Sequence, residues 1–218
     1  NAVSTLKLTL PGNFNQQFII NPDGRIEVWR KLDSGREYLD TDTVWLIKKV
    51  TTKVDASGLQ SIIVEADTPL CVLREPGRFV AYYAGTSQAV YAAAPADDQI
   101  KQVARENIGT SASGGRNIST YISVDPNLNL GASVAKSFAF RDCLKVMQEF
   151  ANASTTAGTY IAFDIIADTP TTLTFRTFAQ QRGVDHRFPS GINPVLISPE
   201  LGNLGEVVFS QDYRDEIT

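Results

Sequence analysis

Histidine and cysteine are scarce in this chain of 218 residues, which contains one histidine and two cysteines. A structural zinc site usually takes four Cys or His ligands, and a small disulfide-stabilised domain has more cysteines, so neither is expected here. Cys71 and Cys143 are far apart and are flanked by apolar residues, which predicts two buried free thiols. His186 lies in the polar stretch RGVDHR, and we interpret it as a solvated residue of a connecting loop.

Motifs that carry catalysis are missing as well. The sequence contains no nucleophile elbow of the form G-x-S-x-G, no P-loop and no G-x-G-x-x-G dinucleotide motif. Ser111 and Ser113 lie in a glycine-rich run, GTSASGG, without the strand-to-helix context of a catalytic serine. We therefore expect no enzyme, and we assign no catalytic, cofactor-binding or metal-binding residue.

Positive charge does not accumulate anywhere along the chain. Its 20 Lys and Arg face 24 Asp and Glu, the formal net charge is −4, and the largest basic cluster is a pair such as Lys48-Lys49. Duplex binding requires a concentrated basic face, so no sequence-specific nucleic-acid binding is expected. The apolar runs are far shorter than the roughly 18 residues of a membrane span, so none is predicted.

The first ninety residues are typical of β-structure. Leu6, Leu8 and Leu10 alternate with polar residues, which is the period of a half-buried strand. Further strands are expected over residues 25–31, 44–54 and 61–66, separated by the turn sequences Pro11-Gly12-Asn13, Asp23-Gly24, Asp33-Ser34-Gly35 and Asp55-Ala56-Ser57-Gly58. Several strands spaced by such turns predict a small β-barrel or a sandwich.

The composition changes after about residue 85. Apolar residues at helical spacing predict a first helix that Asp97 or Asp98 caps and Gly109 ends. A second helix, ending before Gly158, is predicted from one apolar face: Phe140, Cys143, Leu144, Met147, Phe150 and Ala151. A hairpin of residues 160–166 and 172–178 follows, and a final strand begins near Glu206. The predicted fold class is α+β, a β-module with an inserted two-helix and hairpin subdomain and a return to β.

Several acidic residues resemble metal or catalytic sites. Residues 125–131 (DPNLNLG) place oxygen ligands at positions 1, 3 and 5 of a calcium loop, but glycine falls at position 7 and position 12 is Lys136, so a polar turn is favoured. Asp40 and Asp42 are interpreted as the rim of a turn. A carboxylate pair for glycoside cleavage stays open, although solvated strand faces are favoured for the candidates, which are Glu27, Glu37 and Glu65.

Aromatic residues suggest a second class of function. Trp29 and Trp45, with Tyr82 and Tyr83, could form a platform for a carbohydrate. Trp29 is expected on the strand face opposite Ile26 and Val28, and therefore exposed. Aromatic residues of β-modules also serve cores and oligomer contacts, and this reading is favoured.

The order of the segments resembles that of a protein family. The chain is similar to the siphovirus tail-tip or baseplate hub family, which includes the N-terminal hub region of tail-associated lysins and is related to contractile-tail baseplate hubs. The similar segments are residues 24–30 (GRIEVWR), 70–78 (LCVLREPGR), 82–85 (YYAG), 97–107 (DDQIKQVAREN), 140–150 (FRDCLKVMQEF), the hairpin after them and 202–204 (GNL). They span nearly the whole chain in the family's order.

The resemblance implies a fold, an assembly and a location. It implies a small β-barrel hub domain over residues 1–94, an α+β insertion domain over 95–198 and, over 199–218, a return strand that starts a second β-barrel. It also implies a homotrimer that forms a ring at the distal end of the tail tube, within the virion and, during assembly, in the host cytoplasm. Partners would be a distal tail or tube protein and C-terminal fibre or lysin domains.

Two alternatives stay open beside the structural hub. One is a carbohydrate-binding module for host adhesion, and the other is a cell-wall hydrolase domain. The chain begins at Asn1 without methionine or a signal-peptide pattern and ends at Thr218 shortly after a strand-like run, so we expect both ends to be cuts in a longer polypeptide.

Overall fold

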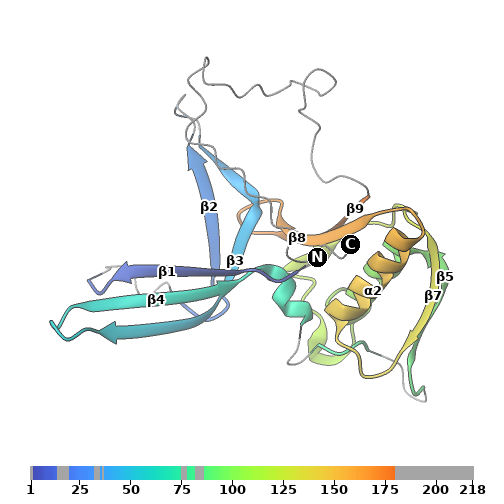
Figure 1. Cartoon of the computed structure of the whole chain (residues 1–218), viewed down its shortest axis with the longest axis horizontal. Helices are drawn as coiled ribbons and strands as arrows, with labels where there is room; N and C mark the ends of the chain where they lie inside the picture. Colours follow the sequence, from blue (N-terminus) through green and yellow to red (C-terminus); the bar gives the residue numbers. More distant parts are fainter. Residues whose placement is uncertain are drawn as a thin grey trace, which may run out of the picture. The chain divides into compact units, whose positions relative to one another are not determined.

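The fold is mixed α+β and consists mostly of β-sheet with two α-helices (Figure 1), which confirms the predicted class at this level. A computed structural model describes residues 2–13, 20–31, 35, 37–74, 78–81 and 86–179. Contacts divide the chain into a unit of Asn1–Gln180 and a unit of Gln181–Thr218, and all described residues lie in the first. The return strand expected over 199–218 lies outside the described residues, and the domain boundaries at 94 and 198 stay predictions.

The N-terminal part is a four-stranded antiparallel sheet with the order β1-β4-β3-β2. Its strands are β1 (Thr5–Pro11), β2 (Arg25–Lys31), β3 (Glu37–Val54) and β4 (Gln60–Asp67). Each predicted strand is present, and β3 begins earlier than the sequence pattern indicated. In the described residues this sheet is open, with β1 and β2 at its edges, so the predicted small barrel is not confirmed.

The second part combines two small sheets. Strands β5 (Ala89–Pro95) and β7 (Ser133–Phe138) form an antiparallel pair. Strands β6 (Ile122–Val124), β8 (Ile161–Ala167) and β9 (Leu173–Ala179) form a sheet of order β6-β9-β8, in which β6 is parallel to β9. The predicted hairpin is therefore confirmed as β8–β9, whereas β5, β6 and β7 were not anticipated.

The two helices are α1 (Ala96–Asn107) and α2 (Cys143–Thr156), and short 3-10 helices η2 (Pro69–Leu73) and η3 (Gly114–Arg116) accompany them. Both helices were predicted, but their N-termini differ from expectation. Pro95 precedes α1 as its N-cap, so Asp97 and Asp98 lie in the first turn instead. Asp142 caps α2 by accepting a hydrogen bond from the Lys145 N–H at 3.0 Å.

Phe140 was wrongly placed on the buried face of the second helix. It precedes α2, is 76% exposed and has a φ of 51°, in the left-handed region that a bulky residue rarely adopts. The other residues predicted for that face are fully or nearly fully buried: Cys143, Leu144, Met147, Phe150 and Ala151.

One large apolar core joins α1, α2 and the sheets of the second part. Tyr91, Phe138 and Phe150 pack on one another within it, with ring centroids 5.5 to 6.2 Å apart. Strand β8 is buried almost throughout, because it contacts α2, β3 and η2 as well as its partner β9. Val44 of β3 belongs to this core, so the four-stranded sheet is anchored to the second part.

A separate small core lies on the four-stranded sheet. It contains Ile47, Ile62 and Val64, with Leu8 and Leu10 packed against them. Two of the three leucines that predicted the first strand, Leu8 and Leu10, therefore contact apolar neighbours. Within the described residues, neither helix has the length and apolar character that crossing a membrane requires.

Candidate functional site

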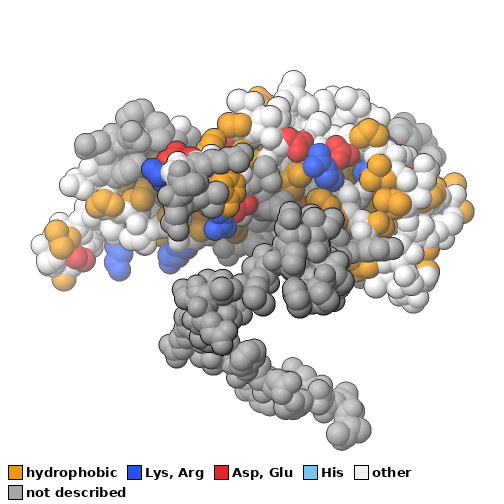
Figure 2. Space-filling model, turned by 90° about the horizontal axis from the view of Figure 1, so that it is seen from above, with side chains coloured by type: hydrophobic (Ala, Val, Ile, Leu, Met, Phe, Trp, Pro, Cys, Tyr) orange, Lys and Arg blue, Asp and Glu red, His pale blue; other side chains and the backbone are white. Residues whose placement is uncertain are grey.

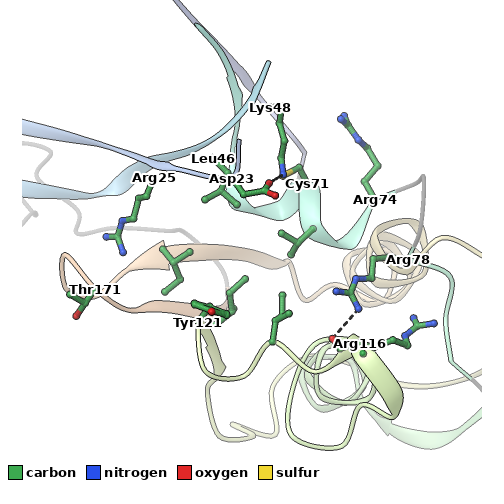
Figure 3. Close-up of a pocket in the computed structure, with 15 residues that line it drawn as sticks. Asp23, Arg25, Leu46, Lys48, Cys71, Arg74, Arg78, Arg116, Tyr121 and Thr171 are labelled. Carbon is green, nitrogen blue, oxygen red and sulfur yellow. Dashed lines mark hydrogen bonds and ion pairs between the residues drawn. The ribbon is translucent and has the colours of Figure 1, made fainter. Parts of the chain in front are cut away.

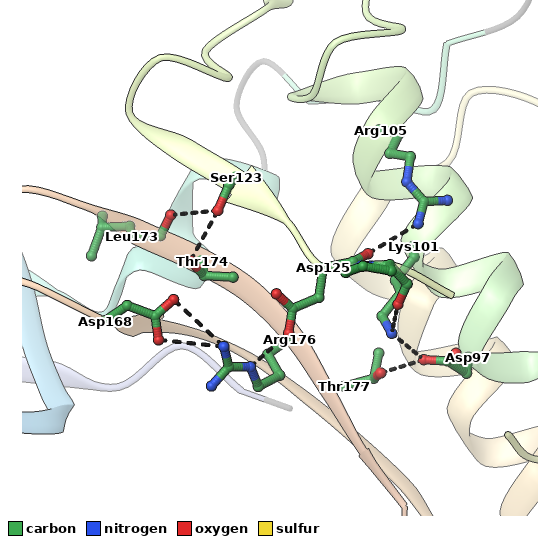
Figure 4. A network of polar contacts seen from close by, with 11 residues as sticks. Asp97, Lys101, Arg105, Ser123, Asp125, Asp168, Leu173, Thr174, Arg176 and Thr177 are labelled. Atoms are coloured by element: carbon green, nitrogen blue, oxygen red, sulfur yellow. Dashed lines mark hydrogen bonds and ion pairs between the residues drawn. The ribbon is translucent and has the colours of Figure 1, made fainter. Parts of the chain in front are cut away.

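The segment that resembles a calcium loop is held by cationic side chains of the protein itself (Figure 4). The Asp125 carboxylate accepts a hydrogen bond from Arg176 Nε at 2.6 Å, and Arg176 also pairs with Asp168. Lys101 Nζ donates to the Pro126 carbonyl at 2.6 Å. Arg and Lys side chains therefore contact the Asp125 carboxylate and the Pro126 carbonyl within residues 125–131, the segment that the sequence predicts as a polar turn.

The centre of this network is a fully buried ion pair. Lys101 Nζ lies 2.8 Å from Asp97 Oδ1, and neither side chain has any exposure. Asp97 also accepts hydrogen bonds from the hydroxyl of Thr177 and from the Leu128 N–H. Burial opposes ionisation of Asp97, but the bonds from Lys101, Thr177 and Leu128 outweigh it and lower the pKa of this carboxyl below its usual value. The pair joins α1 to β9 and to the polar turn.

The other candidate carboxylates are each engaged by a different cation. Glu27 pairs with Arg25 at 2.9 Å, Glu37 with Lys31 at 3.5 Å, and Glu65 with Lys49 at 3.6 Å. Asp40 accepts from Arg30 Nε at 2.7 Å; nothing is described for the side chain of Asp42. Across the described residues, no group of three or more His, Cys, Asp or Glu is arranged to hold a metal ion.

The two tryptophans are placed differently from each other. Trp29 is 54% exposed, as predicted, and its indole N–H donates to Glu27 at 3.0 Å. Trp45 lies on β3 opposite Ile26, and its indole N–H is buried without an acceptor. Tyr82, Tyr83 and His186 lie outside the described residues. Of the two platform residues that the structure describes, Trp29 is exposed and Trp45 is half-buried.

Both cysteines are free thiols, as predicted, but only one is fully buried. Cys143 has no exposure, and burial raises the pKa of its thiol to about 12. Cys71 is half-buried on η2, and burial raises its thiol pKa although the charge of Lys48 opposes the shift.

A cavity of about 750 Å³ lies between the four-stranded sheet and the second part (Figure 3). Its lining includes one acidic residue, Asp23, and five cationic residues: Arg25, Lys48, Arg74, Arg78 and Arg116. The apolar side chains of the lining are Leu46, Val72, Ile118, Tyr121, Ile122 and Leu173. Sequence reasoning missed this site, because its cations are dispersed along the chain from Arg25 to Arg116.

Partners within the chain differ among these cations. Lys48 Nζ lies 2.5 Å from Asp23 Oδ1, and Arg74 Nη2 lies 3.1 Å from Asp67. Arg78 Nη1 instead donates to the carbonyls of Asn107 and Arg116, at 2.9 and 3.0 Å. Burial and the charge of Arg116 lower the pKa of Arg78, which shows that this pair of guanidinium groups is electrostatically unfavourable.

On the face that Figure 2 shows, apolar side chains of the described residues lie at several separate places. The tip of the β3–β4 hairpin is one such place, where Val54 is 63% and Leu59 is 71% exposed. Val90 on β5, Tyr121 and Phe140 are comparably exposed elsewhere.

Comparisons with known proteins add no relative to these observations. Neither the models of known protein families nor the curated protein sequences match this chain.

Proposed function

We propose that this chain is a structural subunit of a phage tail tip, a hub protein that assembles as a homotrimeric ring with other tail proteins. The observation that carries the proposal is the open four-stranded sheet. Its outer strands β1 and β2 have no further strand beside them among the described residues. An open edge presents backbone N–H and C=O groups that a strand of a neighbouring chain can pair with.

The proposal includes a small barrel in the N-terminal part, which is completed when a strand of a neighbouring chain pairs with these open edges. Strand β3 is 18 residues long and pairs with β2 along its first half and with β4 along its second. The register shifts between Glu27 and Trp29 on β2 and between Ile47 and Lys49 on β3. Bulges of this kind increase the twist and bend of a strand and are the means by which sheets curl towards closure.

The ordered segments that resemble tail hubs support the same proposal, and so does the exposed tip of the β3–β4 hairpin. Val54 and Leu59 lie outside both apolar cores and are largely exposed. Apolar residues at such positions are suited to a contact between subunits.

Absolute molar mass tests the proposal most directly. Size exclusion with light scattering should give three times the mass of one chain, and the trimer should dissociate on dilution. Val54→Asp should shift the mass towards a single chain, since a charge at a desolvated contact is unfavourable. Val90→Asp is the matched control, because Val90 is 65% exposed on β5, away from the four-stranded sheet.

A mass of one chain at every concentration would contradict the trimeric hub. If Val90→Asp dissociates the trimer and Val54→Asp leaves it intact, the contact between subunits lies in the second part of the fold. Circular dichroism of both variants confirms that each remains folded.

A carbohydrate-binding module is the second candidate, and the exposed indole of Trp29 favours it. A glycan array should then show binding that Trp29→Ala abolishes without loss of folding. If no glycan on the array binds, the chain is not a carbohydrate-binding module.

A further inference from the structure

The cavity beside η2 differs in charge from the chain as a whole. Five cationic residues and one acidic residue line it, whereas the whole chain has a net charge of −4. Figure 3 shows these cations on separate elements around the cavity, with Arg25 and Lys48 on strands of the sheet, Arg74 beyond η2, and Arg78 and Arg116 on the opposite side. Such a concentration of one sign creates a local attraction for anionic groups.

Among the described residues, two of these cations have no carboxylate partner. Arg116 donates from Nη2 to the Phe79 carbonyl and to Asn107 Oδ1, and its Nε is buried without an acceptor. Arg78 uses Nη1 for the two carbonyl contacts described above. No ion pair of either guanidinium occurs among the described residues. A guanidinium group binds a carboxylate in a bidentate manner, so a ligand carboxylate would offset the repulsion within this pair.

The lining between the cations is apolar. Tyr121 lines the cavity and is 72% exposed. Leu46, Val72 and Leu173 also line the cavity. A volume of about 750 Å³ is within the range of sites that enclose a ligand of many atoms. A single small ion needs far less space. A phosphate ion would need donors converging on one point and would leave the exposed ring of Tyr121 uncovered.

We propose that this cavity binds an acidic peptide segment of a partner protein, whose carboxylates pair with the cations and whose apolar side chains cover Tyr121. Charge complementarity and the mixed lining carry this inference. It does not depend on the trimeric ring, because the cavity is lined by a single chain.

Fluorescence anisotropy with a short labelled peptide that alternates Glu with Leu tests the inference. We expect saturable binding that weakens as salt is raised, and no binding of a peptide that alternates Gln with Leu. Lys48→Gln should weaken binding about ten-fold, as expected for loss of a charge-assisted contact. Lys53→Gln removes the same charge from an exposed position on β3 outside the cavity and should leave binding unchanged.

A second pair of variants, one in the cavity and one outside it, tests the apolar contacts of the peptide. Tyr121→Ala should weaken binding, whereas Tyr160→Ala, at a 49% exposed tyrosine outside the lining, should not. Equal binding of the Gln peptide, or wild-type affinity in both Lys48→Gln and Tyr121→Ala, would overturn the inference. Complete displacement of the peptide by inorganic phosphate at matched ionic strength would also overturn it, by showing a simple anion site.

Discussion

Removing the positive charge of the buried Asp97–Lys101 pair should be among the most destabilising single changes in this chain. In Lys101→Met the Asp97 carboxylate stays fully buried and retains only the hydrogen bonds from Thr177 and the Leu128 N–H. The Pro126 carbonyl also loses its donor, which lies at 2.6 Å. The first loss is the costly one, because it leaves the Asp97 carboxylate without its counter-charge at a position with no solvent exposure.

The magnitude follows from the cost of an uncompensated buried charge. Breaking a buried ion pair by removing one partner costs about 3 to 5 kcal/mol. Two of the hydrogen bonds to Asp97 remain, so we expect about 3 kcal/mol, a large fraction of the stability of a typical domain. Asp97→Asn combined with Lys101→Met should recover most of this loss, because no charge is then left buried.

Urea unfolding followed by circular dichroism measures the effect. The matched control is Lys145→Met, an exposed lysine on α2, for which we expect a change below about 0.5 kcal/mol. A loss below about 1 kcal/mol in Lys101→Met, or a double variant as unstable as the single one, would refute the assignment of the pair as a coupled buried charge.

The pH dependence provides an independent check of the same pair. The pKa of Asp97 is lowered in the folded protein, so its contribution to stability is present above the unfolded value of about 3.9 and is lost as the pH falls through the folded pKa. In Lys101→Met, burial acts without its counter-charge and should raise the pKa of Asp97. The destabilisation relative to wild type should therefore shrink as the pH is lowered towards 4 and Asp97 becomes protonated.

Further predictions concern the thiols and two glycines. Iodoacetamide at neutral pH should label Cys71 and leave Cys143 unreacted until the protein unfolds, and labelling of Cys143 at the same rate would contradict its burial. Because the pKa of Cys143 is raised to about 12, its contribution to stability is present below the unfolded value of about 8.5 and should be lost as the pH rises towards 12, an effect absent in Cys143→Ala. In urea unfolding, Gly131→Ala should lower the free energy of unfolding more than Gly58→Ala. Both glycines have positive φ, so the backbone strain of alanine is common to the two variants. A Cβ at Gly131 would lie 2.7 Å from Ser154 Oγ, whereas a Cβ at Gly58 meets nothing within 4 Å. Equal losses in the two variants would show that backbone strain alone determines the cost.

Local patterns predicted the elements whose signal is contained in neighbouring residues. The alternating leucines of β1, the boundaries of β2 and the hairpin β8–β9 follow from period and turn chemistry alone. Strands β5 and β7 were missed because their pairing joins Ala89 to Phe138, residues far apart in the chain. Asp97 and Lys101 are four residues apart on one helix face, so the spacing could have indicated an ion pair, but not its complete burial.

The sequence by itself determined the α+β class and the exposure of Trp29, because each depends on residue types within a short window, and it predicted a polar turn over residues 125–131. The tertiary structure alone decided that this turn is held by Lys101, Arg105 and Arg176, and that dispersed cations line one cavity. It also left the four-stranded sheet open at both edges in the described residues. These features depend on which strands pair and which helices cover them, and the free energy of those long-range contacts is distributed over the core and not encoded in any one segment.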